Sequence, residues 1–233
     1  MPDADQSVLA IIPARGGSKR LPRKNIVDFC GKPIIAYTIE AALECGRFRR
    51  VVVSTEDNEI ADIARRFGAD VDDRPAHLAG DGVGAVEVCL DLLNREEAAG
   101  HADRVFCCLY PTAPMRGAAD IAAVVDLVEP GRFDFAMAVT AFDLPPHQAL
   151  KMEPGGQANP LFPDLVKKRD EEFGRVVVDN GSTYAATIAA FREHRTFYGP
   201  ALRCHEMPRD RSVDINVAED LEFASFLYRR QVA

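Results

Sequence analysis

The sequence predicts an α/β fold with a mostly parallel sheet, and three features support this class. Short apolar runs alternate with segments of helical periodicity, starting with the run Val8 to Ile12. A glycine-containing loop rich in Arg and Lys follows that first run. A later apolar run, Val105 to Leu109, ends in a proline-rich turn that forces the chain out of a sheet. Strands that alternate with helices form βαβ units, and such units place parallel strands in one sheet.

A helix is expected after the first strand, because Pro33 suits a first helical turn. Small or apolar residues then follow at helical spacing: Ile35, Ile39, Ala42, Leu43 and Gly46. The next strand is expected at Val51 to Ser54, and a second helix should end at Gly68. The apolar face of this second helix comprises Ile60, Ile63, Ala64 and Phe67.

The later elements follow the same alternation. In order, we expect a strand near Val71, a helix from about Gly84 to Glu97, the strand Val105 to Leu109, a helix near Ala118 to Leu127, a strand near Phe135 to Val139, a strand near Thr183 to Ala186, a helix ending at His194, and a C-terminal helix after the segment RSVDINVAED.

Residues 142–178 interrupt the alternation with a polar stretch that contains several prolines. Within it, Leu150 to Glu153 and Ala158 to Phe162 flank the turn Pro154-Gly155-Gly156, which predicts a hairpin. A floppy surface loop is the alternative. Long structureless insertions are unusual in compact domains, which favours a lid or a dimer arm. We therefore expect one domain, residues 1–233, with 142–178 as an inserted arm that acts as a lid or in dimerisation.

Composition and charge exclude several classes of protein. The chain has 233 residues, 47% hydrophobic and 27% charged, as in ordinary globular proteins. A net charge of −8 argues against a nucleic-acid surface. No apolar run reaches the roughly 18 residues that span a bilayer, and the N-terminus MPDADQS does not resemble a signal peptide. The six cysteines and five histidines show no metal-ligand spacing. We expect a cytoplasmic protein with neither nucleic acid nor membrane as a partner.

The loop within IIPARGGSKRLPRKNI, residues 11–26, is the strongest functional signal. It carries five cations and no acidic residue between positions 15 and 24: Arg15, Lys19, Arg20, Arg23 and Lys24. Fixed cations around a glycine turn after a first strand favour a polyanion such as a nucleoside triphosphate. A basic surface loop is the alternative. The spacing matches neither the P-loop nor the dinucleotide-binding G-x-G-x-x-G pattern. The expected phosphate-binding groups are Arg15, the Gly16 and Gly17 amides, Ser18 and Lys24.

Several more polar residues are expected near this loop, because ligands of parallel sheets bind beyond the carboxyl ends of the strands. Ser54-Thr55, Tyr110-Pro111 and Val139-Thr140 all fall at such ends. Arg74, after the third strand, can reach a phosphate or sugar, or it can be an ordinary solvated charge. Lys151 lies in the predicted hairpin, where an exposed lysine needs no further explanation.

Asp214 and Asn216 share one face of a short extended stretch. A carboxylate with a neighbouring oxygen ligand can hold Mg²⁺ together with substrate phosphates. The alternative is that Asp214 marks a strand end and Asn216 caps the final helix.

Taken in order, IIPARGGSKRLPRKNI, DFCGKPIIAYTIEAAL, VVVSTEDNEIADIA, RPAHLAGD, LYPTAPMR and RSVDIN resemble the acylneuraminate cytidylyltransferase family. The resemblance covers most of the chain and is weakest at 153–178. It implies a Rossmann-like three-layer αβα nucleotidyltransferase fold, similar to that of glycosyltransferase-A enzymes, with a protruding dimerisation hairpin. It also implies that CTP is coupled to a nine-carbon α-keto acid sugar, giving a CMP-sugar and pyrophosphate.

The resemblance assigns roles to individual residues. Arg15, Lys24 and Asp214 would be catalytic, Asp214 and Asn216 would hold Mg²⁺, and Tyr110 and Lys151 would contact the sugar, with Lys151 acting in the partner subunit of a homodimer. The nucleotide would be bound by Ala14, Arg15, Gly16, Gly17, Ser18, Lys24, Asn25 and Arg74. The family usually reads Asp-x-Asp where this chain has Asp214-Ile215-Asn216, so one negative charge is missing. No side chain stands out as the general base.

The substrate is expected to be pseudaminate, because several motifs resemble that branch more than the sialate branch. Sialate enzymes usually carry Gln where this chain has Tyr110, and a phenol suits a less polar, deoxygenated sugar. Pseudaminate enzymes usually read DAGQFYW where this chain has DNGSTYA, residues 179–185, so a legionaminate or N-acetylneuraminate enzyme is an alternative. A 3-deoxy-manno-octulosonate cytidylyltransferase has a similar first loop, but GGSK followed by PRKN favours the nine-carbon branch. A sugar-nucleotide glycosyltransferase is disfavoured, because such enzymes usually carry Asp-x-Asp after a central strand, where this chain has Tyr110-Pro111-Thr112. Asn216 in place of the usual Asp leaves a non-catalytic nucleotide-binding relative as an alternative.

Overall fold

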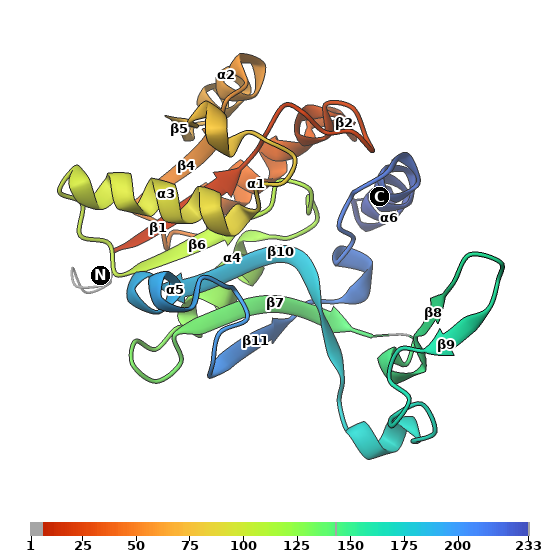
Figure 1. The fold of residues 1–233 in the computed structure, drawn as a ribbon. Helices are drawn as coiled ribbons and strands as arrows, with labels where there is room; N and C mark the ends of the chain where they lie inside the picture. Colours follow the sequence, from red (N-terminus) through yellow and green to blue (C-terminus); the bar gives the residue numbers. More distant parts are fainter. Residues whose placement is uncertain (1–6, 143, 233) are drawn as a thin grey trace.

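The computed structural model describes residues 7–142 and 144–232, and a seven-stranded sheet lies at its centre (Figure 1). The strand order is β11-β7-β10-β6-β1-β4-β5. All neighbouring strands are parallel except β10, which runs antiparallel to β6 and β7. The expected α/β class with a mostly parallel sheet is confirmed. The strands span Val8–Pro13 (β1), Arg50–Thr55 (β4), Asp70–Asp73 (β5), Val105–Leu109 (β6), Phe135–Ala141 (β7), Val177–Thr187 (β10) and Leu202–Glu206 (β11).

Helices cover both faces of the sheet, because successive strand side chains point into two different apolar cores. Ala10 and Ile12 of β1 face the core formed with α1, α2 and α4. Leu9 and Ile11 of the same strand face the core formed with α3 and α5. The expected three-layer αβα arrangement is therefore confirmed. The helices span Ile34–Glu44 (α1), Asn58–Arg66 (α2), Ala85–Ala98 (α3), Ala118–Asp126 (α4), Ile188–His194 (α5) and Ala218–Val232 (α6).

Most predicted helix boundaries follow from local signals. Pro33 directly precedes α1, and the Asp57 side chain accepts hydrogen bonds from two amides of the first turn of α2. Gly68 lies beyond the end of α2 with a φ of 91°, a conformation that glycine adopts without strain. These three positions explain where α1 begins and where α2 begins and ends.

Two strands differ from the prediction. β10 begins at Val177, well before Thr183, and its pairing with β7 shifts register between Asp179 and Tyr184. β11 was not predicted at all. It lies at the edge of the sheet, and none of its residues is fully buried, so its sequence LRCHE lacks an apolar pattern.

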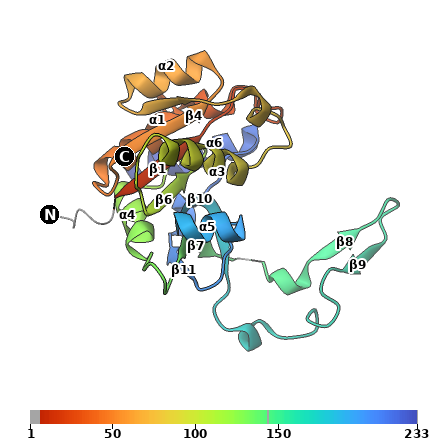
Figure 2. The ribbon, with the colours of Figure 1, turned by 60° about the vertical axis from the view of Figure 1, so that its left-hand side comes forward.

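The segment between β7 and β10 leaves the sheet and carries the predicted hairpin. Its strands, Leu150–Met152 (β8) and Ala158–Pro160 (β9), pair with each other and with no strand of the central sheet. In both views the hairpin projects away from the rest of the chain (Figures 1 and 2). Leu150 and Met152 are 60% and 75% exposed, so this element presents apolar side chains to its surroundings.

Short elements complete the fold. They are the strands Asp28–Phe29 (β2) and Lys32–Pro33 (β3) and the 3-10 helices Lys24–Ile26 (η1), Ala76–Leu78 (η2), Pro146–Gln148 (η3), Asp170–Phe173 (η4) and Arg209–Arg211 (η5). Across residues 7–142 and 144–232, no helix has both the length and the apolar character needed to cross a membrane.

Candidate active site

Loops that follow β1, β5 and β6 meet at one edge of the sheet and enclose two adjoining cavities of about 200 and 300 Å³. Arg15, Lys24 and Asn25 line both cavities. This is the edge formed by the carboxyl ends of the parallel strands, where the sequence predicted a ligand site. The first cavity is also lined by Pro13, Arg74, Val83, Gly84, Ala85, Val88, Tyr110, Pro111 and Thr112, and the second by Ser18, Lys19, Arg20 and Asp81.

Hydrogen bonds from neighbouring segments hold the glycine loop. The Gly16 amide donates to Glu56 Oε1 at 2.8 Å, and the buried Asn25 side chain donates to the Arg15 carbonyl at 2.9 Å. A Cβ atom on residue 16 would collide with Asp57 Oδ2, so any larger residue there would require the Asp57 side chain to shift. The loop shape is therefore built by contacts that are already present in the protein alone. The Gly16 amide, which the sequence predicts to bind phosphate, has the Glu56 carboxylate as its acceptor in this structure.

The remaining loop residues differ in how they are held. The Ala14 amide donates to the Ser54 carbonyl at 3.0 Å, which continues the pairing of β1 with β4. The Ser18 amide donates to the Gly16 carbonyl at 3.1 Å. Gly17 has open space around the position where a Cβ atom would be, so no contact requires glycine at that position.

Three of the five loop cations meet carboxylates. Arg15 Nη1 lies 2.7 Å from Asp81 Oδ1, and Lys19 pairs with the second oxygen of the same carboxylate. Arg23 forms a two-point contact with Asp57, and its Nη2 lies 3.0 Å from Asp57 Oδ1. Hydrogen bonds from Lys19 and Arg15 lower the pKa of Asp81. The basic loop is thus balanced by acidic side chains that come from different loops.

Arg20 and Lys24 have a different partner, the amide oxygen of Asn216. Arg20 Nη2 donates to Asn216 Oδ1 at 2.9 Å, and Lys24 Nζ donates to the same oxygen at 3.1 Å. Burial lowers the pKa of the Lys24 ammonium, although Asp214 acts in the opposite direction. Lys24 is therefore a partly desolvated cation at the boundary of both cavities.

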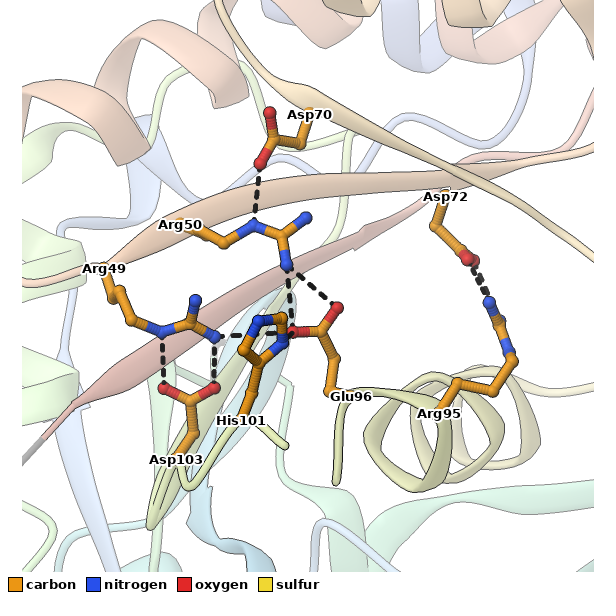
Figure 3. Close-up of polar contacts among 8 residues, drawn as sticks. All are labelled: Arg49, Arg50, Asp70, Asp72, Arg95, Glu96, His101 and Asp103. Atoms are coloured by element: carbon orange, nitrogen blue, oxygen red, sulfur yellow. Dashed lines mark hydrogen bonds and ion pairs between the residues drawn. The ribbon is translucent and has the colours of Figure 1, made fainter. Parts of the chain in front are cut away.

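Arg74 is buried, with only 5% of its surface exposed, so it is not an ordinary solvated charge. Its Nη2 donates to the Ser54 carbonyl at 2.5 Å, and its Nη1 lies 3.8 Å from Glu56 Oε2. That oxygen is buried and has no hydrogen-bond partner in the described part of the chain. Burial lowers the pKa of Arg74. The Ser54 hydroxyl donates to Asp72 at 2.8 Å, and Asp72 pairs with Arg95 of α3 (Figure 3).

A neighbouring ion-pair network connects the beginnings of β4 and β5 with the end of α3 (Figure 3). Arg50 lies 2.7 Å from Asp70 and 3.0 Å from Glu96, and Arg49 donates to Asp103 at 3.0 Å. These groups lie near the amino ends of the strands, at the edge opposite the two cavities. We assign them a structural role.

Asp214 is connected to the basic loop through Asn216 and is held through both carboxylate oxygens. Thr112 Oγ1 donates to Asp214 Oδ1 at 2.8 Å, and Asn216 Nδ2 donates to Asp214 Oδ2 at 2.7 Å. The Asn216 side chain does not cap α6, because its Oδ1 accepts from Arg20 and Lys24, and the Asp220 side chain accepts the backbone N–H groups of residues 216 and 217. The described residues contain no group of three or more His, Cys, Asp or Glu side chains arranged to hold a metal ion.

Tyr110 borders the first cavity and packs against a second tyrosine. Its ring centroid lies 5.2 Å from that of Tyr184, and burial raises the pKa of its phenol. Beneath it, the buried Arg116 donates to the Ser182 carbonyl at 2.6 Å and to the Thr38 hydroxyl at 2.7 Å. Burial lowers the pKa of Arg116 to about 10. This arginine fixes the loop after β6 from inside the protein.

The structure does not bring Lys151 to the rest of the predicted site residues of the same chain. Its side chain is 69% exposed on β8, and its Nζ lies 3.1 Å from Glu153. The other predicted site residues lie around the cleft or beside it, whereas Thr140, expected near the basic loop, lies within β7 and lines a different cavity. No site role was predicted from the sequence for several residues that border or support the cleft: Glu56, Asp81, Thr112 and Arg116. Of these, Glu56 directly after β4 and Thr112 shortly after β6 have a local signal, their place at the carboxyl end of a strand.

Comparison with known proteins gives a consistent result. A family model described as cytidylyltransferase matches residues 9–143, more than half of the chain. A pseudaminic acid cytidylyltransferase from Campylobacter jejuni is 36% identical over 225 residues, which cover 95% of this chain and 96% of the relative. A CMP-N,N'-diacetyllegionaminic acid synthase from Legionella pneumophila is 35% identical over 195 residues, 82% of each chain.

Among solved structures, a CMP:2-keto-3-deoxy-manno-octonic acid synthetase complexed with CTP superimposes with a TM-score of 0.72. The alignment covers 97% of this chain and 100% of that chain, at 17% identity. This likeness supports the fold described above.

Proposed function

The chain belongs to the cytidylyltransferase family, and on that premise we propose that it couples CTP to a nine-carbon α-keto acid sugar, with pseudaminate favoured, and releases pyrophosphate. One observation carries the proposal: Arg15 and Lys24 both border the two adjoining cavities at the carboxyl edge of the sheet. Cations fixed at the boundary of both cavities suit a triphosphate. The cavity lined by Arg74, Tyr110 and Thr112 leaves room for the nucleoside or the sugar.

The proposed reaction is a single in-line displacement. The anomeric hydroxyl oxygen of the sugar attacks the α-phosphorus of CTP and forms the new P–O bond. The bond from the α-phosphorus to the bridging oxygen breaks, pyrophosphate departs, and the hydroxyl proton is lost. Arg15 and Lys24 would stabilise the charge that develops on the leaving pyrophosphate. The geometry assigns no side chain as the general base, so the sugar carboxylate or water is proposed to take the proton.

Members of this family generally depend on a divalent metal, and we propose Mg²⁺ here. Mg²⁺ usually binds through one or two carboxylates, with waters and substrate phosphates completing the shell. Asp214 fits this requirement, because each of its oxygens accepts one hydrogen bond and retains a free lone pair. Asn216 does not fit as placed, since its Oδ1 faces the cations Arg20 and Lys24. When bound, Mg²⁺ would neutralise part of the triphosphate charge.

We propose the following roles for the remaining site residues. Arg74 and the loop residues Ala14, Gly16, Gly17, Ser18 and Asn25 would hold the nucleotide. For Gly16, nucleotide binding would require its amide to leave Glu56, to which it donates at 2.8 Å. Tyr110 would contact the sugar through its ring, which already packs against Tyr184. Since CTP is made in the cytoplasm, we propose that the protein acts there.

We also propose a homodimer in which residues 142–178 reach the neighbouring subunit. The hairpin exposes Leu150 and Met152, which would be costly without a partner. A cavity of about 620 Å³ lies between α6, the last residues of β7 and the first residues of β10. Its lining includes the apolar residues Phe142, Leu144, Val178, Phe223 and Leu227. The arm of a second copy would cover such apolar surface. This arrangement would also explain why Lys151 lies outside the cleft of its own chain.

Pyrophosphate release from CTP, measured with a panel of keto-acid sugars, tests the proposal. The panel contains pseudaminate, legionaminate, N-acetylneuraminate and 3-deoxy-manno-octulosonate. We expect release that depends on both CTP and a nine-carbon sugar, with the CMP-sugar confirmed by mass spectrometry. Pyrophosphate release with 3-deoxy-manno-octulosonate alone, the eight-carbon sugar of the panel, would assign the chain to the 3-deoxy-manno-octulosonate branch instead. Binding of CTP without turnover of any sugar would favour a non-catalytic relative.

A further inference from the structure

The side-chain amide of Asn216 contacts one carboxylate and two cations beside the cleft at once. Its Nδ2 donates to Asp214 Oδ2 at 2.7 Å, and its Oδ1 accepts from Arg20 at 2.9 Å and from Lys24 at 3.1 Å. Rotating the amide by half a turn would place its NH₂ group against two cations and its oxygen against a carboxylate. Both contacts would be repulsive, so the chemistry of the neighbours fixes the orientation.

The electrostatic consequence concerns the cations of the basic loop. Arg15 and Lys19 share the Asp81 carboxylate, and Arg23 pairs with Asp57. In the described part of the chain, Arg20 and Lys24 meet no carboxylate at ion-pair distance, and both donate to the neutral Asn216 oxygen instead. A neutral acceptor holds a cation in place without cancelling its charge. Both positive charges therefore stay available to an anionic ligand.

Asn216 also positions the Asp214 carboxylate. Asp214 is oriented by Thr112 through one oxygen and by Asn216 through the second. A carboxylate at position 216 would lose the donated hydrogen bond and place a second negative charge beside Asp214. It would also form full ion pairs with Arg20 and Lys24, and a phosphate would then have to displace it.

We propose that Asn216 is a positioning residue that sets Asp214 and Lys24 at a fixed separation while it neutralises neither of them. The inference rests on the proposed function, because it assumes that a triphosphate enters this cleft. It differs from the role expected from the sequence, in which Asn216 was a metal ligand. If Asn216 were a metal ligand, a carboxylate at this position would strengthen metal binding. If it is a neutral positioning residue, a carboxylate would weaken the binding of the triphosphate.

Isothermal titration of CTP into the wild-type protein, N216D and N216A tests the inference, both in EDTA and at saturating Mg²⁺. N216D should weaken CTP binding by about tenfold or more in both buffers, because the new carboxylate competes for Arg20 and Lys24. N216A frees both cations, so its affinity for CTP should stay within about threefold of wild type while kcat falls about tenfold through lost alignment. N94D, on the exposed side of α3, adds the same charge away from the cleft and should match wild type.

Manganese binding followed by electron paramagnetic resonance supplies the second readout, with Mn²⁺ alone as the probe. N216D should not bind Mn²⁺ more tightly than wild type. CTP binding by N216D that equals or exceeds that of wild type would overturn the inference, as would a clear gain in Mn²⁺ affinity. Circular dichroism and thermal melting establish that each variant is folded. If the wild-type protein bound no CTP in either buffer, the proposed function itself would fail, which is a separate result.

Discussion

Arg15 Nη1 donates a hydrogen bond to Asp81 Oδ1 at 2.7 Å, so the loop after β1 and the loop after β5 are joined by an ion pair. The two residues lie 66 positions apart in the sequence. Lys19 pairs with the same carboxylate, so two cations share one acidic side chain, whose single negative charge balances only one of them. A triphosphate that used Arg15 would have to compete with Asp81 for it.

The first prediction follows from this competition. Asp81→Asn removes the competing charge but keeps the shape of the side chain. We expect CTP to bind up to about fivefold more tightly at low salt, with a smaller gain at high salt, because exposed ion pairs are weak and easily screened. Asp62→Asn is the matched control, since Asp62 is an exposed partner of Arg65 on α2. Weaker CTP binding by Asp81→Asn would show that Asp81 supports the ligand instead of competing with it.

The second prediction concerns the two cations that border both cavities. Arg15→Ala and Lys24→Ala should each lower kcat/KM by tenfold or more while the protein stays folded, because both charges would act on the departing pyrophosphate. Steady-state kinetics with circular dichroism measures this. Arg47→Ala is a suitable control, because Arg47 pairs with Asp126 on an exposed surface. Near-normal turnover in either folded variant would remove the phosphate role from that residue.

How far the sequence could predict these features depends on how local each feature is. The strand–helix alternation, the proline before α1 and the glycine beyond α2 are local patterns, and they were sufficient to predict most of the fold. The β11 strand lies at the edge of the sheet with partly exposed residues, so no apolar pattern marked it.

The candidate site could be predicted less completely than the fold, because most of its contacts join distant parts of the sequence. The basic loop is visible in the sequence, but its partners Glu56, Asp81 and Asn216 lie between 40 and 196 positions away from the loop residues that they contact. No spacing rule links residues so far apart. Arg74 illustrates the consequence: a lone arginine in a loop is usually solvated, yet here it is buried against the Ser54 carbonyl.

The third prediction concerns the metal. Activity should require Mg²⁺, and Asp214→Ala should reduce it by about a hundredfold or more, because the variant loses the carboxylate proposed to hold the ion beside the phosphates. The dependence of turnover on Mg²⁺ concentration, measured for both proteins, tests this. Asp126→Ala removes an exposed carboxylate elsewhere and serves as the control. Unchanged Mg²⁺-dependent turnover in Asp214→Ala would rule out Asp214 as the ligand.

The fourth prediction concerns the arm. We expect light scattering to report a dimer, and the double change Leu150→Glu with Met152→Glu to shift it toward monomer, because charges would replace exposed apolar contacts. Active monomeric wild-type protein would contradict the proposal.

Mixing two inactive variants tests the exchange of arms directly. Lys151→Ala has an intact cleft and a defective arm, whereas Arg15→Ala has an intact arm and a defective cleft. If the arm acts in the neighbour's cleft, each mixed dimer contains one complete site. An equimolar mixture, after subunits exchange, should then recover about a quarter of wild-type activity. No recovery in mixtures shown to contain mixed dimers would place Lys151 outside the partner's site.

The last prediction concerns the sugar. Tyr110 borders the cleft and packs its ring against Tyr184, and burial raises the pKa of its phenol, so this wall of the cavity is aromatic and neutral. A neutral aromatic wall suits a sugar with a terminal methyl group, as in pseudaminate, better than one with a terminal hydroxyl, as in N-acetylneuraminate. Apolar pockets discriminate by about 10- to 200-fold per methyl-sized difference. We therefore expect kcat/KM for pseudaminate, or a close 9-deoxy relative, to exceed that for N-acetylneuraminate by at least tenfold. Tyr110→Gln should narrow this ratio, since an amide can bond to the extra hydroxyl, whereas Tyr198→Gln changes an exposed tyrosine and should leave it unaltered. Equal or better kcat/KM with N-acetylneuraminate in the wild-type protein would overturn the substrate assignment and leave the cytidylyltransferase assignment in place.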